Sequence, residues 1–180
     1  LGAIASQIWE GDVIQLSFTI PEGWNRSQMA AALDAQGFVS AADFLAATEA
    51  IPYDRHPWLP RDLPHLEGFL YPETYQIPSE QVSAEGIVDI MLSRFETIAL
   101  PIFQQQQSRY DLIEWVTLAS IVEKEAVAAE ERDTIAGVFD RRLHEGITLG
   151  SDQTVEYGLG ITQTPQKPPP LAPLPTPNTT

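Results

Sequence analysis

The sequence predicts an α+β protein in which a short strand is followed mainly by helices. Of its 180 residues, 43% are apolar, which is enough to bury a core and argues against a disordered chain. An apolar, β-branched run at 13–20 ends in Pro-Glu-Gly and indicates a strand entering a turn. Two helix-start signals follow, Asn25 with Gln28 and Ser40 with Asp43. A strand and two short helices therefore form a small α+β unit.

The middle of the chain leads from this unit into longer helices. Four prolines without a clear period between 51 and 64 predict a connector. The segment 66–78 is dense in aromatic and turn-forming residues and predicts an ordered loop with short strands. Apolar residues at helical spacing over 87–98 predict an amphipathic helix.

The last third contains two more helical patterns and then a proline-rich end. A capping signal at Asp111 predicts a helix from 112 to about 129, and a second apolar stripe predicts a helix over 131–144. Residues 149–160 predict a glycine-bounded loop or short helix. Seven prolines between 164 and 177 predict an extended linker.

Charge and composition exclude several classes of function. Twenty-five acidic and ten basic residues give a formal charge of −15, so the chain should repel nucleic-acid phosphates and anionic lipids. The absence of cysteine excludes a thiolate zinc site, a cysteine nucleophile and disulfides. The chain begins at Leu1 and has no membrane-spanning apolar run, so we expect a fragment whose membrane anchor lies outside these residues.

The candidate catalytic group is a carboxylate near the end of the 112–129 helix. At about 100° per residue, Leu118, Val122 and Glu125 fall on one apolar stripe, and Glu123 points to the opposite side. A carboxylate in an apolar setting is easily protonated, as a general acid requires. The alternative is that Glu125 is a boundary residue whose stem packs while its head reaches water. Glu123 is expected to be a solvated helix charge.

Two further clusters contain candidate binding residues. Asp152, Thr154 and Tyr157 could line a cleft wall and hydrogen-bond a sugar, although Asp152 could equally cap a short helix. In the 67–75 segment, aromatic rings such as Tyr71 suit stacking against sugar faces, although aromatics more often anchor cores or loops. Glu67 could be structural and accept backbone N–H bonds. The three histidines have no metal-like spacing, and we expect no metal or cofactor.

Three blocks, at 66–75, 118–143 and 152–158, resemble the signature of the endolytic murein transglycosylase (MltG, YceG-like) family. The segment 18–23 and the two helices after it resemble the small LysM-like module that precedes the catalytic part in this family. The resemblance implies a LysM-like module over 1–57 and a helix-rich α+β catalytic domain over 58–180 whose C-terminal part is missing.

The resemblance also implies an activity. The family cleaves the β-1,4 bond between N-acetylmuramic acid and N-acetylglucosamine in nascent peptidoglycan strands and leaves 1,6-anhydro ends. Its catalytic glutamate matches Glu125, and we expect substrate-binding roles for Glu67, Tyr71, Asp152, Thr154 and Tyr157. The implied protein is anchored in the bacterial inner membrane by a single span, with this region on the periplasmic side. Its expected partners are glycan strands, and cell-wall synthases are a further candidate.

Departures from the family pattern leave two rival functions open. Gln153 stands where the family usually has proline, Glu156 stands where it has an apolar residue, and the chain ends before the family's last segment. One rival is a non-catalytic peptidoglycan-binding or cell-wall-synthesis scaffold module. The other is a glycoside hydrolase that pairs Glu125 with Asp152.

Overall fold

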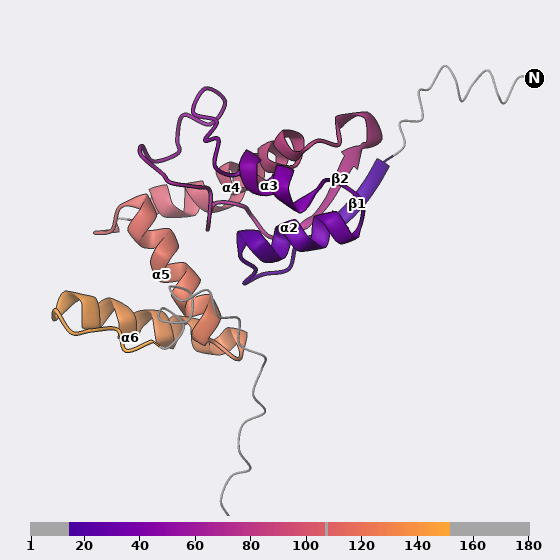
Figure 1. Cartoon of the computed structure of the whole chain (residues 1–180). Helices are drawn as coiled ribbons and strands as arrows, with labels where there is room; N and C mark the ends of the chain where they lie inside the picture. Colours follow the sequence, from indigo (N-terminus) through magenta and orange to yellow (C-terminus); the bar gives the residue numbers. More distant parts are fainter. Residues whose placement is uncertain (1–14, 107, 152–180) are drawn as a thin grey trace, which may run out of the picture.

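A computed structural model describes residues 15–106 and 108–151 (Figure 1). The elements follow in the order β1 (Gln15–Thr19), α2 (Arg26–Ala35), α3 (Ala41–Ala47), β2 (Thr74–Pro78), η1 (Ser79–Gln81), α4 (Ala84–Gln105), α5 (Leu112–Glu125), η2 (Ala129–Glu131) and α6 (Arg132–His144). The predicted α+β class is confirmed, and the LysM-like assignment stays a prediction.

A two-stranded sheet and three helices share one core in the N-terminal part. β1 and β2 are antiparallel, with Phe18 opposite Tyr75, and these two rings stack at 5.3 Å. α2 packs on α3, and α3 packs on α4. The core contains buried side chains from each of these helices, including Leu33, Phe44 and Met91. Because apolar burial is the main source of stability, this cluster holds the strands and helices together.

The helix starts follow the local capping signals. The Asn25 side chain accepts from the Gln28 N–H at 2.9 Å, and the Gln28 side chain accepts from the Asn25 N–H at 3.0 Å. The Ser40 hydroxyl likewise accepts from the Asp43 N–H at the start of α3. These bonds satisfy N–H groups that have no partner inside a helix. The two predicted short helices are confirmed.

The sheet and the core both cross position 57/58, where the sequence analysis placed a module boundary. β1 lies before this position and β2 lies after it. The connector after α3 is also tied back to that helix, because the Leu66 N–H donates to the Thr48 carbonyl at 2.9 Å. The first structural unit thus continues from β1 to α4.

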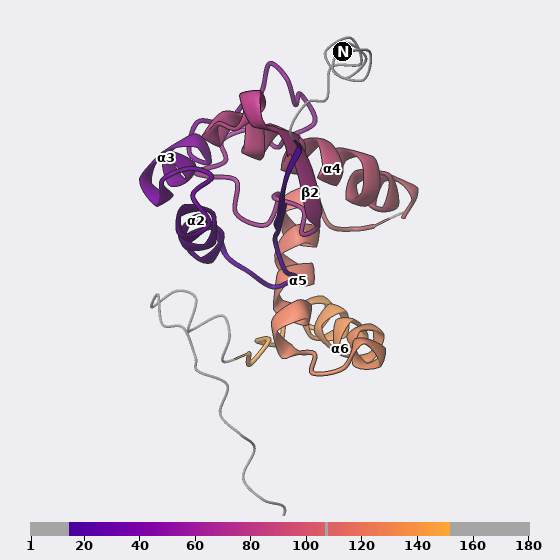
Figure 2. The same cartoon turned by 90° about the vertical axis from the view of Figure 1, so that its right-hand side faces the viewer.

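Helices α5 and α6 form a hairpin that extends from this unit (Figures 1 and 2). The prediction that the first of these helices continues to about Ala129 was wrong, because Ala126 takes an extended conformation with ψ of 123°. The helix therefore ends at Glu125. Within the described residues, no helix is long and apolar enough to cross a membrane.

Two other predictions differ from the structure or lie outside it. α4 is longer than the predicted 87–98 helix and has Pro101 in its interior. Beyond 151, the predicted 149–160 segment and the whole proline-rich segment lie outside the described residues.

Candidate active site

Glu125 is the last residue of α5, and its carboxylate meets the loop that follows α6. The side chain is half-buried, and its Oε1 accepts a hydrogen bond from the Ser151 hydroxyl at 2.5 Å. On the same stripe of the helix, Val122 is buried. Leu118 on this stripe is only partly buried, and Glu125 lies at the C-terminal end of the stripe with a polar partner.

The loop that carries Ser151 is held against α6. The Ile147 N–H donates to the Arg142 carbonyl at 2.8 Å, and the Arg142 guanidinium donates to the Leu149 carbonyl at 2.5 Å. Gly150 then adopts a φ of +63°, a region that suits glycine. These contacts turn the chain so that Ser151 is buried beside Glu125.

The opposite side of α5 is occupied by an ion-pair cluster. Arg132 pairs with Glu123 at 3.0 Å and with Glu22 at 3.1 Å. The charge of Glu123, followed by contacts with Glu22, raises the pKa of Arg132. The Glu123 side chain, which was predicted to be a solvated helix charge, is 31% exposed, because Arg132 and the turn after β1 cover part of this side.

The 66–75 block packs against the same helix. Gly68 has a φ of +83°, and a Cβ atom there would lie 2.6 Å from Cγ1 of the buried Val116. The block and α5 therefore approach so closely that only glycine fits at this point. Of the predicted site segments, this one is brought against the middle of α5, the helix that ends at Glu125.

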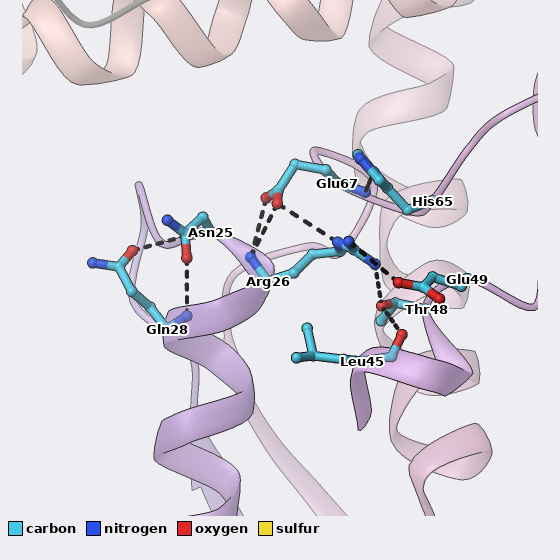
Figure 3. Close-up of polar contacts among 8 residues, drawn as sticks. All are labelled: Asn25, Arg26, Gln28, Leu45, Thr48, Glu49, His65 and Glu67. Carbon is cyan, nitrogen blue, oxygen red and sulfur yellow. Dashed lines mark hydrogen bonds and ion pairs between the residues drawn. The ribbon is translucent and has the colours of Figure 1, made fainter. Parts of the chain in front are cut away.

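Glu67 connects the block to the N-terminal unit (Figure 3). Both of its carboxylate oxygens accept from the Arg26 N–H at 3.2 Å, and Arg26 Nε lies 3.7 Å from Oε2. Arg26 also donates to the buried Thr48 hydroxyl at 2.7 Å. A carboxylate at the start of α2 also faces the positive end of the helix dipole. Glu67 thus accepts from a backbone N–H group, as one interpretation expected, but this group belongs to Arg26 at the start of α2 and not to the turn around Glu67.

The tyrosines of the block anchor it to the core. The Tyr75 hydroxyl donates to the Tyr71 carbonyl at 2.5 Å, and Tyr71 is half-buried against the core. Burial, and then the charge of Glu73, raise the pKa of Tyr75 well above its usual range. Core anchoring, the alternative interpretation of these aromatics, is what the described contacts show.

The predicted site residues are only partly gathered by the described part of the chain. Glu125 meets a polar partner, whereas the described contacts of Glu67 and Tyr71 are with α2 and with the core. Asp152, Thr154 and Tyr157 lie outside the described residues. Among the described residues, no group of three His, Asp or Glu side chains could hold a metal ion.

Sequence reasoning missed Ser151 and Arg142. Ser151 stands directly before Asp152, and only Asp152, Thr154 and Tyr157 of this polar cluster were predicted to bind the substrate. Arg142 was assigned only to the 118–143 block, with no role. The sequence signal for the turn that brings Ser151 to Glu125 was the glycine at 150.

The sequence and fold are similar to those of known bacterial proteins. The crystal structure of a yceG-like protein from Listeria monocytogenes is similar with a TM-score of 0.68 and 30% identity, over 92% of this chain and 60% of that one. The model of the YceG-like family matches residues 1–172. The chain belongs to the YceG-like family.

Two curated relatives share a name. A Streptococcus pneumoniae protein is 32% identical over 163 residues, 80% of this chain and 29% of its own length, and is named endolytic murein transglycosylase. A Bacillus subtilis protein of the same name is 31% identical over 96 residues, 53% of this chain and 27% of its own length. The chain thus spans less than a third of each relative.

Proposed function

We propose that this chain carries the general acid/base, Glu125, of an endolytic peptidoglycan lytic transglycosylase. The observation that supports this function best is the Glu125 carboxylate, which is held at the end of α5 by the Ser151 hydroxyl. Its relatives are named endolytic murein transglycosylases, which agrees with a carboxylate that acts on a glycan.

The proposed reaction needs one carboxyl group that changes role. Neutral Glu125 donates its proton to the glycosidic oxygen as the bond from C1 of N-acetylmuramic acid to O4 of N-acetylglucosamine breaks. The Glu125 carboxylate then takes the proton of the C6 hydroxyl of the same muramic residue as that oxygen bonds to C1. No water is consumed, one product ends in 1,6-anhydro-N-acetylmuramic acid, and Glu125 regains its proton.

The surroundings of the neighbouring glutamate support a single-carboxylate mechanism. Hydrolases generally use two carboxyl groups, one as acid and one as base or nucleophile. Glu123 is close in sequence, but it lies on the other side of α5, where its ion pair with Arg132 gives it a structural role. Glu125 therefore acts without Glu123.

The remaining predicted site residues bind the glycan, and the protein works in the cell envelope. Asp152, Thr154, Tyr157 and Tyr71 contact the sugars, and Glu67 contributes by holding its block to α2 as well as by the sugar contact expected from the sequence. The substrate is the nascent glycan strand, and this region works outside the cytoplasmic membrane, to which a single span elsewhere in the protein anchors it.

The test is mass spectrometry of uncrosslinked glycan strands incubated with the intact protein. Wild type is compared with Glu125→Gln, and with Glu123→Gln as a matched control on the same helix. We expect internal fragments with 1,6-anhydro ends from wild type and from Glu123→Gln. We expect Glu125→Gln to lose about 100-fold or more of the rate, the scale of general acid/base catalysis.

Three results would contradict the proposal. Unimpaired cutting by a folded Glu125→Gln variant would remove Glu125 from the reaction. Reducing ends in place of anhydro ends would favour the hydrolase that pairs Glu125 with Asp152. Intact glycan that co-sediments with folded wild-type protein would favour the binding module.

A further inference from the structure

We propose that Ser151 is a positioning residue that decides which oxygen of Glu125 transfers the proton. This inference rests on the proposed role of Glu125 as acid and base. It assigns Oε1 to Ser151 and Oε2 to the glycosidic oxygen and, later, to the C6 hydroxyl.

The contact between the two side chains is built by elements far apart in the sequence. Ser151 Oγ lies 2.5 Å from Glu125 Oε1, and Ser151 is only 6% exposed. A buried hydroxyl is costly unless it is hydrogen-bonded. The half-buried Glu125 carboxylate at the end of α5 thus accepts from the buried Ser151 hydroxyl of the loop after α6.

Two constraints fix the position of the serine. Arg142 of α6 donates to the Leu149 carbonyl at 2.5 Å and holds the backbone two residues before Ser151. Gly150 turns the chain with a φ of +63°, and a Cβ atom there would lie 3.5 Å from Arg142 Nη1. The hydroxyl is therefore delivered by an anchored turn.

The direction of this hydrogen bond has a chemical consequence. A neutral carboxyl group has one O–H oxygen and one carbonyl oxygen, and only the carbonyl oxygen accepts well. With Ser151 donating to Oε1, the proton of the acid resides on Oε2. After the proton leaves, Ser151 still donates to Oε1, now of a carboxylate, and the bond becomes stronger. The same contact orients Glu125 in both half-reactions.

The position of Glu125 at the end of α5 makes the hydrogen bond from Ser151 more important for the carboxylate form. A helix C-terminus carries partial negative charge from its unpaired carbonyl groups and disfavours an anion. Glu125 is the last residue of α5, so its carboxylate form gains from a donor on the side away from the substrate. Ser151 supplies that donor without introducing a charge.

The experiment uses Ser151→Ala and Ser151→Thr, together with Gly150→Ala, which keeps the hydroxyl and strains the turn that delivers it. The first readout is the ¹³C carboxyl resonance of Glu125, identified by its absence in Glu125→Gln. The second is the rate at which anhydro ends form, separated into kcat and KM. Neither a shift of that resonance nor rescue by threonine is expected from a purely structural serine.

We expect Ser151→Ala to shift the resonance and to lower kcat about 10- to 100-fold, with KM within about twofold, because one hydrogen bond to a charged group is lost. Gly150→Ala should also lower kcat. Ser151→Thr should have a resonance and a kcat closer to those of wild type than Ser151→Ala has. An unshifted resonance or a wild-type kcat in Ser151→Ala, with Glu125→Gln inactive, would overturn this inference alone. Full activity of Glu125→Gln would overturn the proposed function.

Discussion

Gly68 lies where the 66–75 block approaches α5 closely. Its φ of +83° is unfavourable for residues with a Cβ atom, and such an atom would lie 2.6 Å from Val116 Cγ1. Conformation and space therefore require glycine for independent reasons. The close packing at Gly68 fixes α5, and with it Glu125, relative to the block.

We predict that Gly68→Ala lowers the free energy of unfolding by about 2–4 kcal/mol, the sum of overpacking and of a left-handed backbone. Gly137→Ala is the matched control, because Gly137 lies in α6 with open space around it, and it should stabilise the chain by about 0.5–1 kcal/mol. Adding Val116→Ala to Gly68→Ala should relieve the overpacking and leave the backbone strain. Denaturant unfolding measures all three, and equal effects of the two glycine substitutions would refute the close approach.

At the scale of single residues, the positions of side chains within a helix could be predicted from the sequence, whereas their distant partners could not. The place of Glu125 on one side of its helix could be predicted, because it depends only on neighbours in the same helix. The partners of Glu125 and Glu123 were missed because Ser151 and Arg132 reach them across turns that no local pattern specifies. Glu67 was one of two open readings, and only the fold showed that it reaches Arg26.

At the scale of elements, helix starts were more predictable than helix ends. Asp111 and Glu114 form the capping box of α5, as Asn25 and Gln28 do for α2, because a cap is a contact between residues three apart. The end of α5 carries no such local signal. The helix ends before Ala126, and α6 then packs against α5. This packing is a tertiary contact that neighbouring residues do not specify.

Asp140 ties the two helices of the hairpin together at the end away from Glu125. The Tyr110 hydroxyl donates to Asp140 Oδ1 at 2.8 Å, and Arg109 donates to Oδ2 at 2.5 Å. Arg109 also lies 2.9 Å from a ring nitrogen of His144. The hydrogen bonds from Arg109, then from Tyr110, lower the pKa of Asp140 below its ordinary value of 3.8.

This shift predicts a dependence of stability on pH with a defined sign. A carboxylate whose pKa is lower in the folded state contributes stability above its unfolded value, and the contribution is lost as the pH falls through the folded pKa. We therefore expect wild type to be more stable than Asp140→Asn at pH 7, and the difference to shrink as the pH falls below 3.8.

Urea unfolding of both proteins across this range measures the effect. Tyr110→Phe, which removes one of the two donors, should show a smaller difference over the same range. A constant gap between wild type and Asp140→Asn at every pH would exclude the linkage.

At the scale of the whole molecule, the class of fold was predictable and its long-range pairing was not. The sequence patterns predict a first strand, short strands within 66–78, short helices and longer helices, each from adjacent residues. The pairing of β1 with β2 joins residues such as Phe18 and Tyr75 across two helices and a connector. A local pattern does not specify which distant strand completes a sheet, so the pairing of β1 with β2 could not be predicted from neighbouring residues.

The N-terminal unit and the α5–α6 hairpin are joined by charge as well as by packing. Arg132 of α6 bridges Glu22, in the turn after β1, and Glu123 of α5. A Cβ atom at the adjacent Gly23 would lie 3.8 Å from Glu123 Cγ, so the turn lies close against the helix. This junction is formed two residues from Glu125 and helps set its position relative to the rest of the chain.

We predict that Arg132→Met loosens this junction with little loss of overall stability. The three side chains are between 31% and 65% exposed, so solvent screens the pairs and their removal should lower the free energy of unfolding only slightly. Hydrogen exchange should nevertheless accelerate at Gly23 and at the end of α5, and about 1 M salt should have a similar effect on wild type. Arg141→Met, which breaks only the pair with Glu145 inside the same region of α6, should leave those amides unchanged. Equal exchange at Gly23 in wild type and Arg132→Met would show that packing around Gly68 alone holds the hairpin, and the charge triad would then have no part in positioning Glu125.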